Sequence, residues 1–132
     1  MAHVITFRSS MFDVTKETPN PINPIAGEGV LLWLRGKLEI AQYEVTVPDS
    51  EDWGWYVYVR GAGASYMVGA GADIPEQGPV EEWTIQVHKQ RSLKDRIKGV
   101  GKLAADDPLS ALIESIMRAE KGIESIDVDK AG

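Results

Sequence analysis

The chain has 132 residues, a net charge of −6 and no cysteine. The acidic balance argues against nucleic acid and against an anionic membrane as partners, because both bind basic surfaces. The lack of thiols excludes disulfides, zinc–thiolate sites and cysteine nucleophiles. We expect one domain over residues 1–132, no cofactor and no metal, in a cytoplasmic protein of bacterial type without a secretory signal.

The first third of the chain predicts one strand and one helix. Residues 3–10 contain β-branched and aromatic residues and no strand breaker, which is typical of a strand. Three prolines within residues 17–24 exclude a helix or a central strand there. Asn23 and Pro24 are residue types favoured at N-cap and N1, so we expect a helix from this point to near Leu38.

The middle of the chain predicts four strands. Apolar and polar residues alternate in residues 43–47, 53–60, 64–72 and 80–90. The acidic residues 49–52 read as a turn, and the Gly-Ala-Gly of residues 61–63 reads as a hairpin loop whose glycines can adopt a positive φ. Short turns between successive strands favour antiparallel pairing.

The last third predicts two helices. Ser92 and Asp95 resemble a capping box, and Leu93, Ile97 and Val100 follow at helical spacing. The second helix has stronger signals, with Asp107 as N-cap, Pro108 at N1 and Gly122 after its end. The tail, residues 123–132, is compatible with a short strand or with fraying.

Together these elements predict an α+β fold. We expect a single antiparallel sheet of four to five strands with helices packed on one face, in the order β-α-β-β-β-β-α-α. The helices would cover the apolar side of the sheet.

The alternation around the tryptophans predicts which face of the sheet each side chain occupies. Trp53 and Trp55 share parity with the valines at positions 57 and 59, so both indoles should point toward the helices. Gly54 has the opposite parity, beside Tyr56. A glycine in a strand often marks a bulge or a close backbone approach.

The opposite, outer face is the candidate binding surface. Tyrosine, methionine and arginine are enriched at protein interfaces. The alternative is an ordinary amphipathic face that the first strand or the proline-rich segment partly covers. The outer-face residues of this hypothesis are Tyr56, Tyr58, Arg60, Met67, Gln86 and His88.

Other candidate chemistry has a simpler structural interpretation. His88 has no carboxylate or serine at a catalytic spacing, and His3 lies too near the terminus to be informative. The Gly/Ala-rich residues 61–73 do not match a phosphate-binding loop. The basic segment 88–102 has six Lys or Arg and one Asp. Its cations are either the solvated face of a helix or a weak anion site, formed by Lys94, Arg96 and Lys98.

We therefore expect a non-enzymatic protein-interaction module, comparable to an immunity protein or an adaptor. One alternative is a small-molecule-binding module or cofactor-free enzyme, with a pocket between sheet and helices lined by Trp33, Trp55, Trp83 and His88. Another is self-association through the outer face. The expected partner is a protein or a second copy of the chain, not nucleic acid or a membrane.

Overall fold

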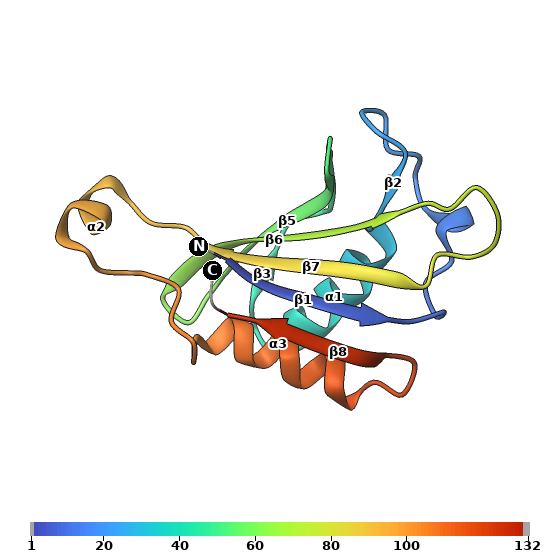
Figure 1. The fold of residues 1–132 in the computed structure, drawn as a ribbon. Helices are drawn as coiled ribbons and strands as arrows, with labels where there is room; N and C mark the ends of the chain where they lie inside the picture. The colour runs from blue at the N-terminus through green and yellow to red at the C-terminus, as the bar shows by residue number, and fades with distance from the viewer. Residues whose placement is uncertain (1, 131–132) are drawn as a thin grey trace.

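The computed structural model describes residues 2–130 as a mostly-sheet fold, with one eight-stranded antiparallel sheet and three α-helices (Figure 1). The antiparallel pairing is confirmed. The expected α+β fold with four to five strands is wrong, because two short segments and the C-terminal segment also pair with the sheet.

The central path of the sheet has the strand order β3-β5-β6-β7-β1-β8. Two further strands pair at its margin, β2 with β6 and β4 with β5. The strands are β1 (Ala2–Arg8), β2 (Ile25–Ala26), β3 (Glu44–Val45), β4 (Asp49–Glu51), β5 (Gly54–Gly61), β6 (Ala64–Asp73), β7 (Glu82–Lys89) and β8 (Glu124–Asp129). The helices are α1 (Glu28–Ile40), α2 (Leu93–Lys98) and α3 (Pro108–Ala119), and Val14–Lys16 form a 3-10 turn.

The extra strands form where a distant backbone supplies hydrogen-bonding partners. Three residues of the segment expected as a turn, Asp49–Glu51, form β4, which pairs with the start of β5. The tail is β8, which pairs with β1 at the far edge. The expected β5–β6 hairpin is confirmed, and Ala62 and Gly63 at its tip both have a positive φ.

Helix α1 begins four residues later than Asn23 and Pro24 indicate. Ile25 and Ala26 pair with β6, and the helix starts after Gly27. Its first amides donate to the Glu17 carboxylate: Oε1 accepts from Gly27 at 3.0 Å, and Oε2 accepts from Gly29 at 3.0 Å. A carboxylate from the preceding segment thus replaces the local cap that the sequence indicated.

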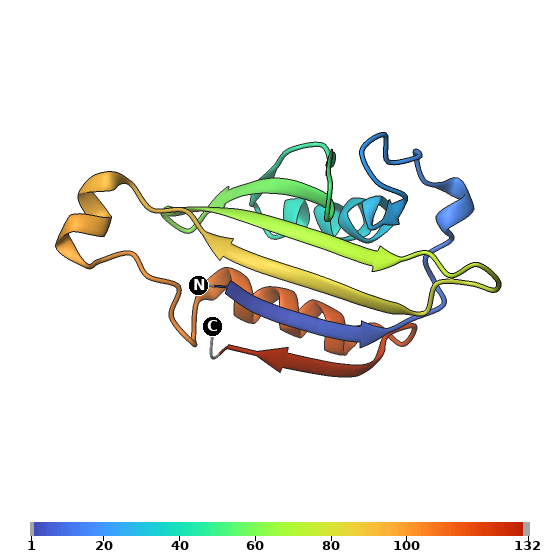
Figure 2. The same cartoon turned by 45° about the horizontal axis from the view of Figure 1, so that its top comes forward.

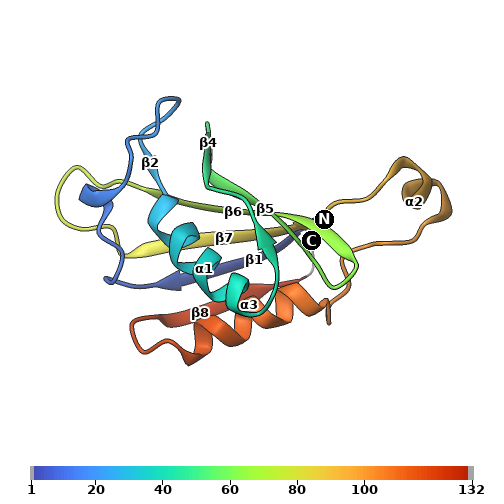
Figure 3. The same ribbon diagram turned by 180° about the vertical axis from the view of Figure 1, so that it is seen from behind.

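The core lies between the sheet and two helices, α1 and α3, which both cover its inner face (Figure 3). Trp55, Val57 and Val59 point inward from β5, as expected from their parity. The inner residues of β1, β6 and β7 are buried in the same way, and Figure 2 shows these long strands side by side.

Trp53 does not follow the expected parity. Gly54 has a φ of 147°, and a side chain on it would meet the Ala70 carbonyl oxygen at 2.4 Å. This close approach of β5 to β6 turns the chain before the strand begins, so Trp53 lies on the outer face over Gly69. The inward prediction for Trp53 is therefore wrong, although it holds for Trp55.

Helix α2 is separate from this layered body. It stands clear of the sheet and of α1 and α3 in all three ribbon views (Figures 1–3). The Ser92 half of the expected capping box is confirmed, because Ser92 Oγ accepts from the Asp95 amide at 3.1 Å. None of its residues is buried. None of the helices in residues 2–130 has the length and apolar character that a membrane crossing requires.

Candidate functional site

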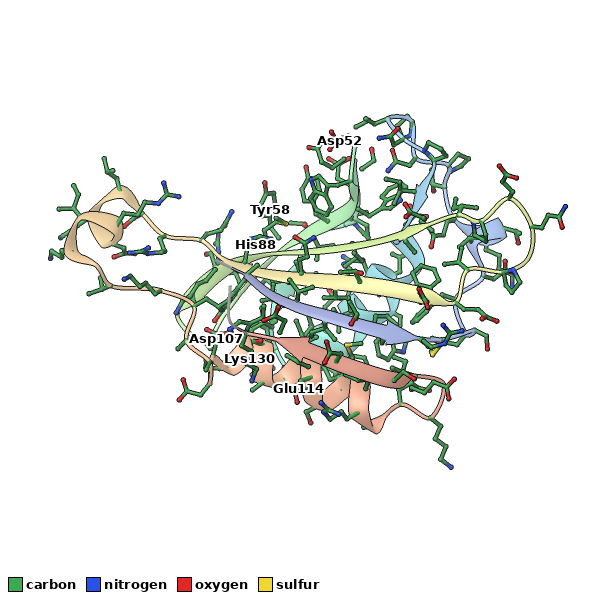
Figure 4. All side chains as sticks on the ribbon, in the orientation of Figure 1. Asp52, Tyr58, His88, Asp107, Glu114 and Lys130 are labelled. Atoms are coloured by element: carbon green, nitrogen blue, oxygen red, sulfur yellow. The ribbon has the colours of Figure 1, made fainter. Side chains whose placement is uncertain are left out.

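The outer face brings the expected binding residues onto neighbouring strands. In the register of β5, β6 and β7, Tyr58 lies opposite Met67, which lies opposite His88. In the next row, Tyr56 lies opposite Gly69, which lies opposite Gln86. Figure 4 shows Tyr58 and His88 on the side of the sheet away from α3.

Three aromatic side chains form a continuous row on this face. The Tyr56 ring lies between the other two, with centroid distances of 6.3 Å to Trp53 and 5.5 Å to Tyr58. Tyr58 is 46% exposed and Trp53 is 38% exposed. Rings held at such distances keep their apolar faces available at little entropic cost, which is typical of residues that anchor a partner.

A groove of about 870 Å³ lies beside this row, across β6, β7 and β1. Gly69 and Gly71 line it, and Trp53 with the β6–β7 loop bounds it. A side chain on Gly69 would meet the Trp53 ring at 2.6 Å, so the missing side chain is what lets the indole lie against the strand. The groove is thus produced by glycines on the outer side of β6.

The second end of the aromatic row leads to Arg60. Tyr58 and Arg60 line a smaller hollow of about 480 Å³ against β3. Arg60 lies opposite Ser65, one row beyond Tyr58. Between the two hollows, His88 Nε2 and Gln86 Oε1 are 3.1 Å apart, and burial lowers the pKa of His88. At neutral pH the His88 imidazole is therefore uncharged.

Carboxylates border the aromatic row. Asp49 of β4 lies opposite Tyr56, whose hydroxyl donates to Asp49 Oδ2 at 3.5 Å. Partial burial and the Asp49 charge raise the pKa of Tyr56. Glu51 lies opposite Gly54, and Asp52 is at the tip of the β4–β5 hairpin (Figure 4). Within residues 2–130, no Lys or Arg forms an ion pair with these three acids.

A second polar cluster lies on the inner side, and the sequence reading did not identify it. His3 is buried, and its Nδ1 shares a 2.5 Å hydrogen bond with Ser110 Oγ of α3. Asp107 caps α3 and accepts from the Tyr66 hydroxyl at 2.9 Å. The Lys89 ammonium lies 3.7 Å from the same carboxylate.

This inner cluster joins α3 to the sheet. Burial, and then the charge of Lys130, lowers the pKa of His3, which keeps the imidazole neutral. The histidine and the serine are almost completely covered, so substrate cannot reach them. His3 is thus a buried residue that links β1 to α3. Its parity with Ile5 and Phe7 was the available signal for burial.

Two other sequence-derived sites are not assembled. Lys94, Arg96 and Lys98 are exposed on α2, where Arg96 projects to a different side from the other two. The indoles of the expected pocket between sheet and helices lie on the inner side, whereas His88 lies on the outer face. Trp33 and Trp83 instead pack edge-on around Phe12.

No protein-family model, curated protein or solved structure matches this chain. No group of three or more His, Asp or Glu within residues 2–130 is placed to hold a metal ion. The candidate functional site is therefore the outer face, where aromatic rings, a groove and carboxylates without ion-pair partners come together.

Proposed function

We propose that this protein is a non-enzymatic interaction domain that binds a protein partner across the outer face of its sheet. The observation that carries the proposal is the half-exposed row of Trp53, Tyr56 and Tyr58. These rings are held together beside a groove, and neither α1 nor α3 covers them. Rigid aromatic anchors surrounded by a polar rim are the usual centre of a protein interface.

The charges around the row favour a basic segment as the partner. Asp49, Glu51 and Asp52 stand at one side, and Asp127 of β8 lies opposite Thr6 on the same face. The cation that lines the groove, Arg8, is already paired with Glu81 and Glu82. A partner with Lys or Arg beside an apolar side chain would meet complementary charge, which favours association and specificity. The same charges disfavour nucleic acid.

Site-specific photo-cross-linking tests the proposal. Tyr58 is replaced by p-benzoylphenylalanine in the full chain, and Ile40, which is 83% exposed on α1, receives the same replacement as the control. We expect position 58 to cross-link a defined protein segment that mass spectrometry identifies and that binds when purified. Tyr56→Ala should weaken that binding by at least about tenfold. Identical adducts at both positions would overturn the proposal.

A small molecule is the second candidate occupant of the groove. The volume of about 870 Å³ is in the range of ligand pockets, and one wall is an indole. A saturable change in tryptophan fluorescence with a metabolite, abolished by Trp53→Phe, would support this candidate. A metabolite panel that leaves the fluorescence unchanged would remove its support.

A further inference from the structure

The segment between β7 and α3 has the composition that the outer face should bind. We call residues 90–102 the α2 arm. It leaves the body at the end of β7 and returns before Asp107, and it extends beyond the ends of the strands (Figures 1 and 2). It carries five Lys or Arg and one Asp, a net charge of +4, so the rest of the chain carries −10.

Local hydrogen bonds hold the arm in a defined shape. Ser92 caps α2, and Gly99 ends it in the left-handed conformation. Arg91 Nε donates to the Val100 carbonyl at 3.0 Å, which closes the arm into a loop around the helix. However, a six-residue helix gains little stability in water unless another surface covers its apolar side.

The apolar side of the arm is uncovered. Leu93 is 73% exposed and Ile97 is 79% exposed. The two residues are one helical turn apart and therefore lie on the same side of α2. Lys94 and Lys98 flank this pair on one side and Arg96 flanks it on the other. Within residues 2–130, none of these three cations is in an ion pair. The arm is therefore an apolar pair bordered by unpaired cations.

The outer face has the complementary arrangement, since its aromatic row is bordered by unpaired carboxylates. We propose that the α2 arm of one copy of this chain docks on the outer face of a second copy. Leu93 and Ile97 then pack on Trp53, Tyr56 and Tyr58, and the arm's cations face Asp49, Glu51 and Asp52. This inference rests on the proposed function of the outer face and names its occupant.

The position of the arm favours a second copy over the same chain. Trp53 and the groove lie toward the β6–β7 loop, whereas Tyr58 lies in the row of His88, close to the end of β7 from which the arm leaves. The arm extends beyond this end of the strands and does not lie over the aromatic row of its own chain. The arm also points away from the body in each view. The arm of a neighbouring molecule can reach the groove without any rearrangement of this chain.

Sedimentation velocity of the full chain tests the inference. We expect a concentration-dependent dimer or larger assembly at low salt that weakens as salt is raised. The arm variant Leu93→Ser/Ile97→Ser and the face variant Tyr56→Ala/Tyr58→Ala should each weaken self-association by at least tenfold. The control is Ile40→Ser, an exposed apolar residue on another element, and it should leave self-association unchanged. Circular dichroism establishes that each variant folds.

Mixing the two defective variants gives the most specific result. The arm variant retains an intact face, and the face variant retains an intact arm, so their mixture should form a heterodimer although neither variant forms a homodimer. Such complementation requires contact between the arm of one molecule and the face of another. A mixture that stays monomeric would contradict the inference.

Other outcomes overturn the inference and separate it from the proposed function. A monomer at all concentrations would overturn the inference, whether the arm stays free or folds onto the outer face of its own chain. Arm-dependent binding to phosphatidylserine vesicles without self-association would assign the arm to a membrane surface. If a different protein cross-links at position 58 and the chain remains monomeric, the proposed function stands and this inference fails. If neither association occurs, both fail.

Discussion

Helices α2 and α3 have similar local signals and opposite environments. Both begin with a side-chain N-cap, Ser92 and Asp107, and both have an apolar stripe. The stripe of α3 is buried under the sheet, including Ile113, whereas Leu93 and Ile97 of α2 face solvent. Caps and periodicity therefore specify that a helix forms. They do not specify whether the same chain covers it.

The difference lies in what the cap of each helix contacts. Asp107 caps α3 and also holds Tyr66 and Lys89, which lie on two strands of the sheet. The Ser92 hydroxyl accepts a bond from its own helix. One cap ties its helix to the body, and the other organises an isolated arm. Substitutions at matched positions of the two helices should separate these roles.

The largest difference in the free energy of unfolding should come from substitutions in the apolar stripes of α3 and α2. Ile113→Ala removes a fully buried side chain and leaves a cavity, so it should lower the free energy of unfolding by about 4 kcal/mol. Ile97→Ala, the matched change in α2, should lower it by less than about 0.5 kcal/mol because the side chain is exposed. Urea unfolding followed by tryptophan fluorescence measures both. Equal losses would show that the arm packs on the body.

The second-largest difference in stability should come from substitutions of the two N-cap residues. Asp107→Ala removes the cap of α3 and leaves the buried Tyr66 hydroxyl without its acceptor, which should cost about 2–3 kcal/mol. The same urea experiment measures this loss, with Asp106→Ala as the control because Asp106 is the exposed neighbouring acid. A loss below about 1 kcal/mol would mean that Asp107 acts as a cap alone and does not link α3 to the sheet.

The attachment of α3 should also depend on pH. In the unfolded state His3 has the ordinary histidine pKa of about 6.5. Burial lowers this pKa in the folded state, so the folded protein takes up the proton at a lower pH than the unfolded chain does. This contribution to stability is present above pH 6.5 and is lost as pH falls through the folded-state pKa. The urea midpoint should therefore decrease from pH 7.5 to pH 5.5.

Histidine substitutions identify the source of that slope. His3→Gln keeps a hydrogen-bonding group beside Ser110 and should flatten the decrease. Burial lowers the pKa of His88 as well, so His88→Gln should remove a further part in the same direction. An unchanged slope in the His3 variant would contradict the assignment.

The smallest effect on global stability should come from the cap of α2. Ser92→Ala should change the free energy of unfolding by less than about 0.5 kcal/mol, because the arm contributes nothing to the core. The same substitution should speed amide hydrogen exchange in residues 93–100, since the helix loses its N-terminal acceptor. Unchanged exchange would show that the cap does not hold the arm.

Helices α2 and α3 show which features can be predicted from the sequence and which cannot. Alternation predicts that Tyr56, Tyr58 and Arg60 lie on one face of the sheet and Val57 and Val59 on the other. The prediction follows because successive side chains in a regular strand point to opposite faces. The β5–β6 hairpin and the Asp107 cap can also be predicted from the sequence, since each depends on residues adjacent in the chain. These parts of the fold follow from local stereochemistry.

Only the tertiary structure decided the remaining features, because each depends on a backbone distant in the chain. Segments β2 and β4 are strands because β6 and β5 offer free hydrogen-bonding edges. Trp53 lies on the outer face because β5 approaches β6 at Gly54, and His3 meets Ser110 across 107 positions of sequence. The amphipathic stripe of α2 is exposed for the same reason: within residues 2–130, no surface of its own chain covers it.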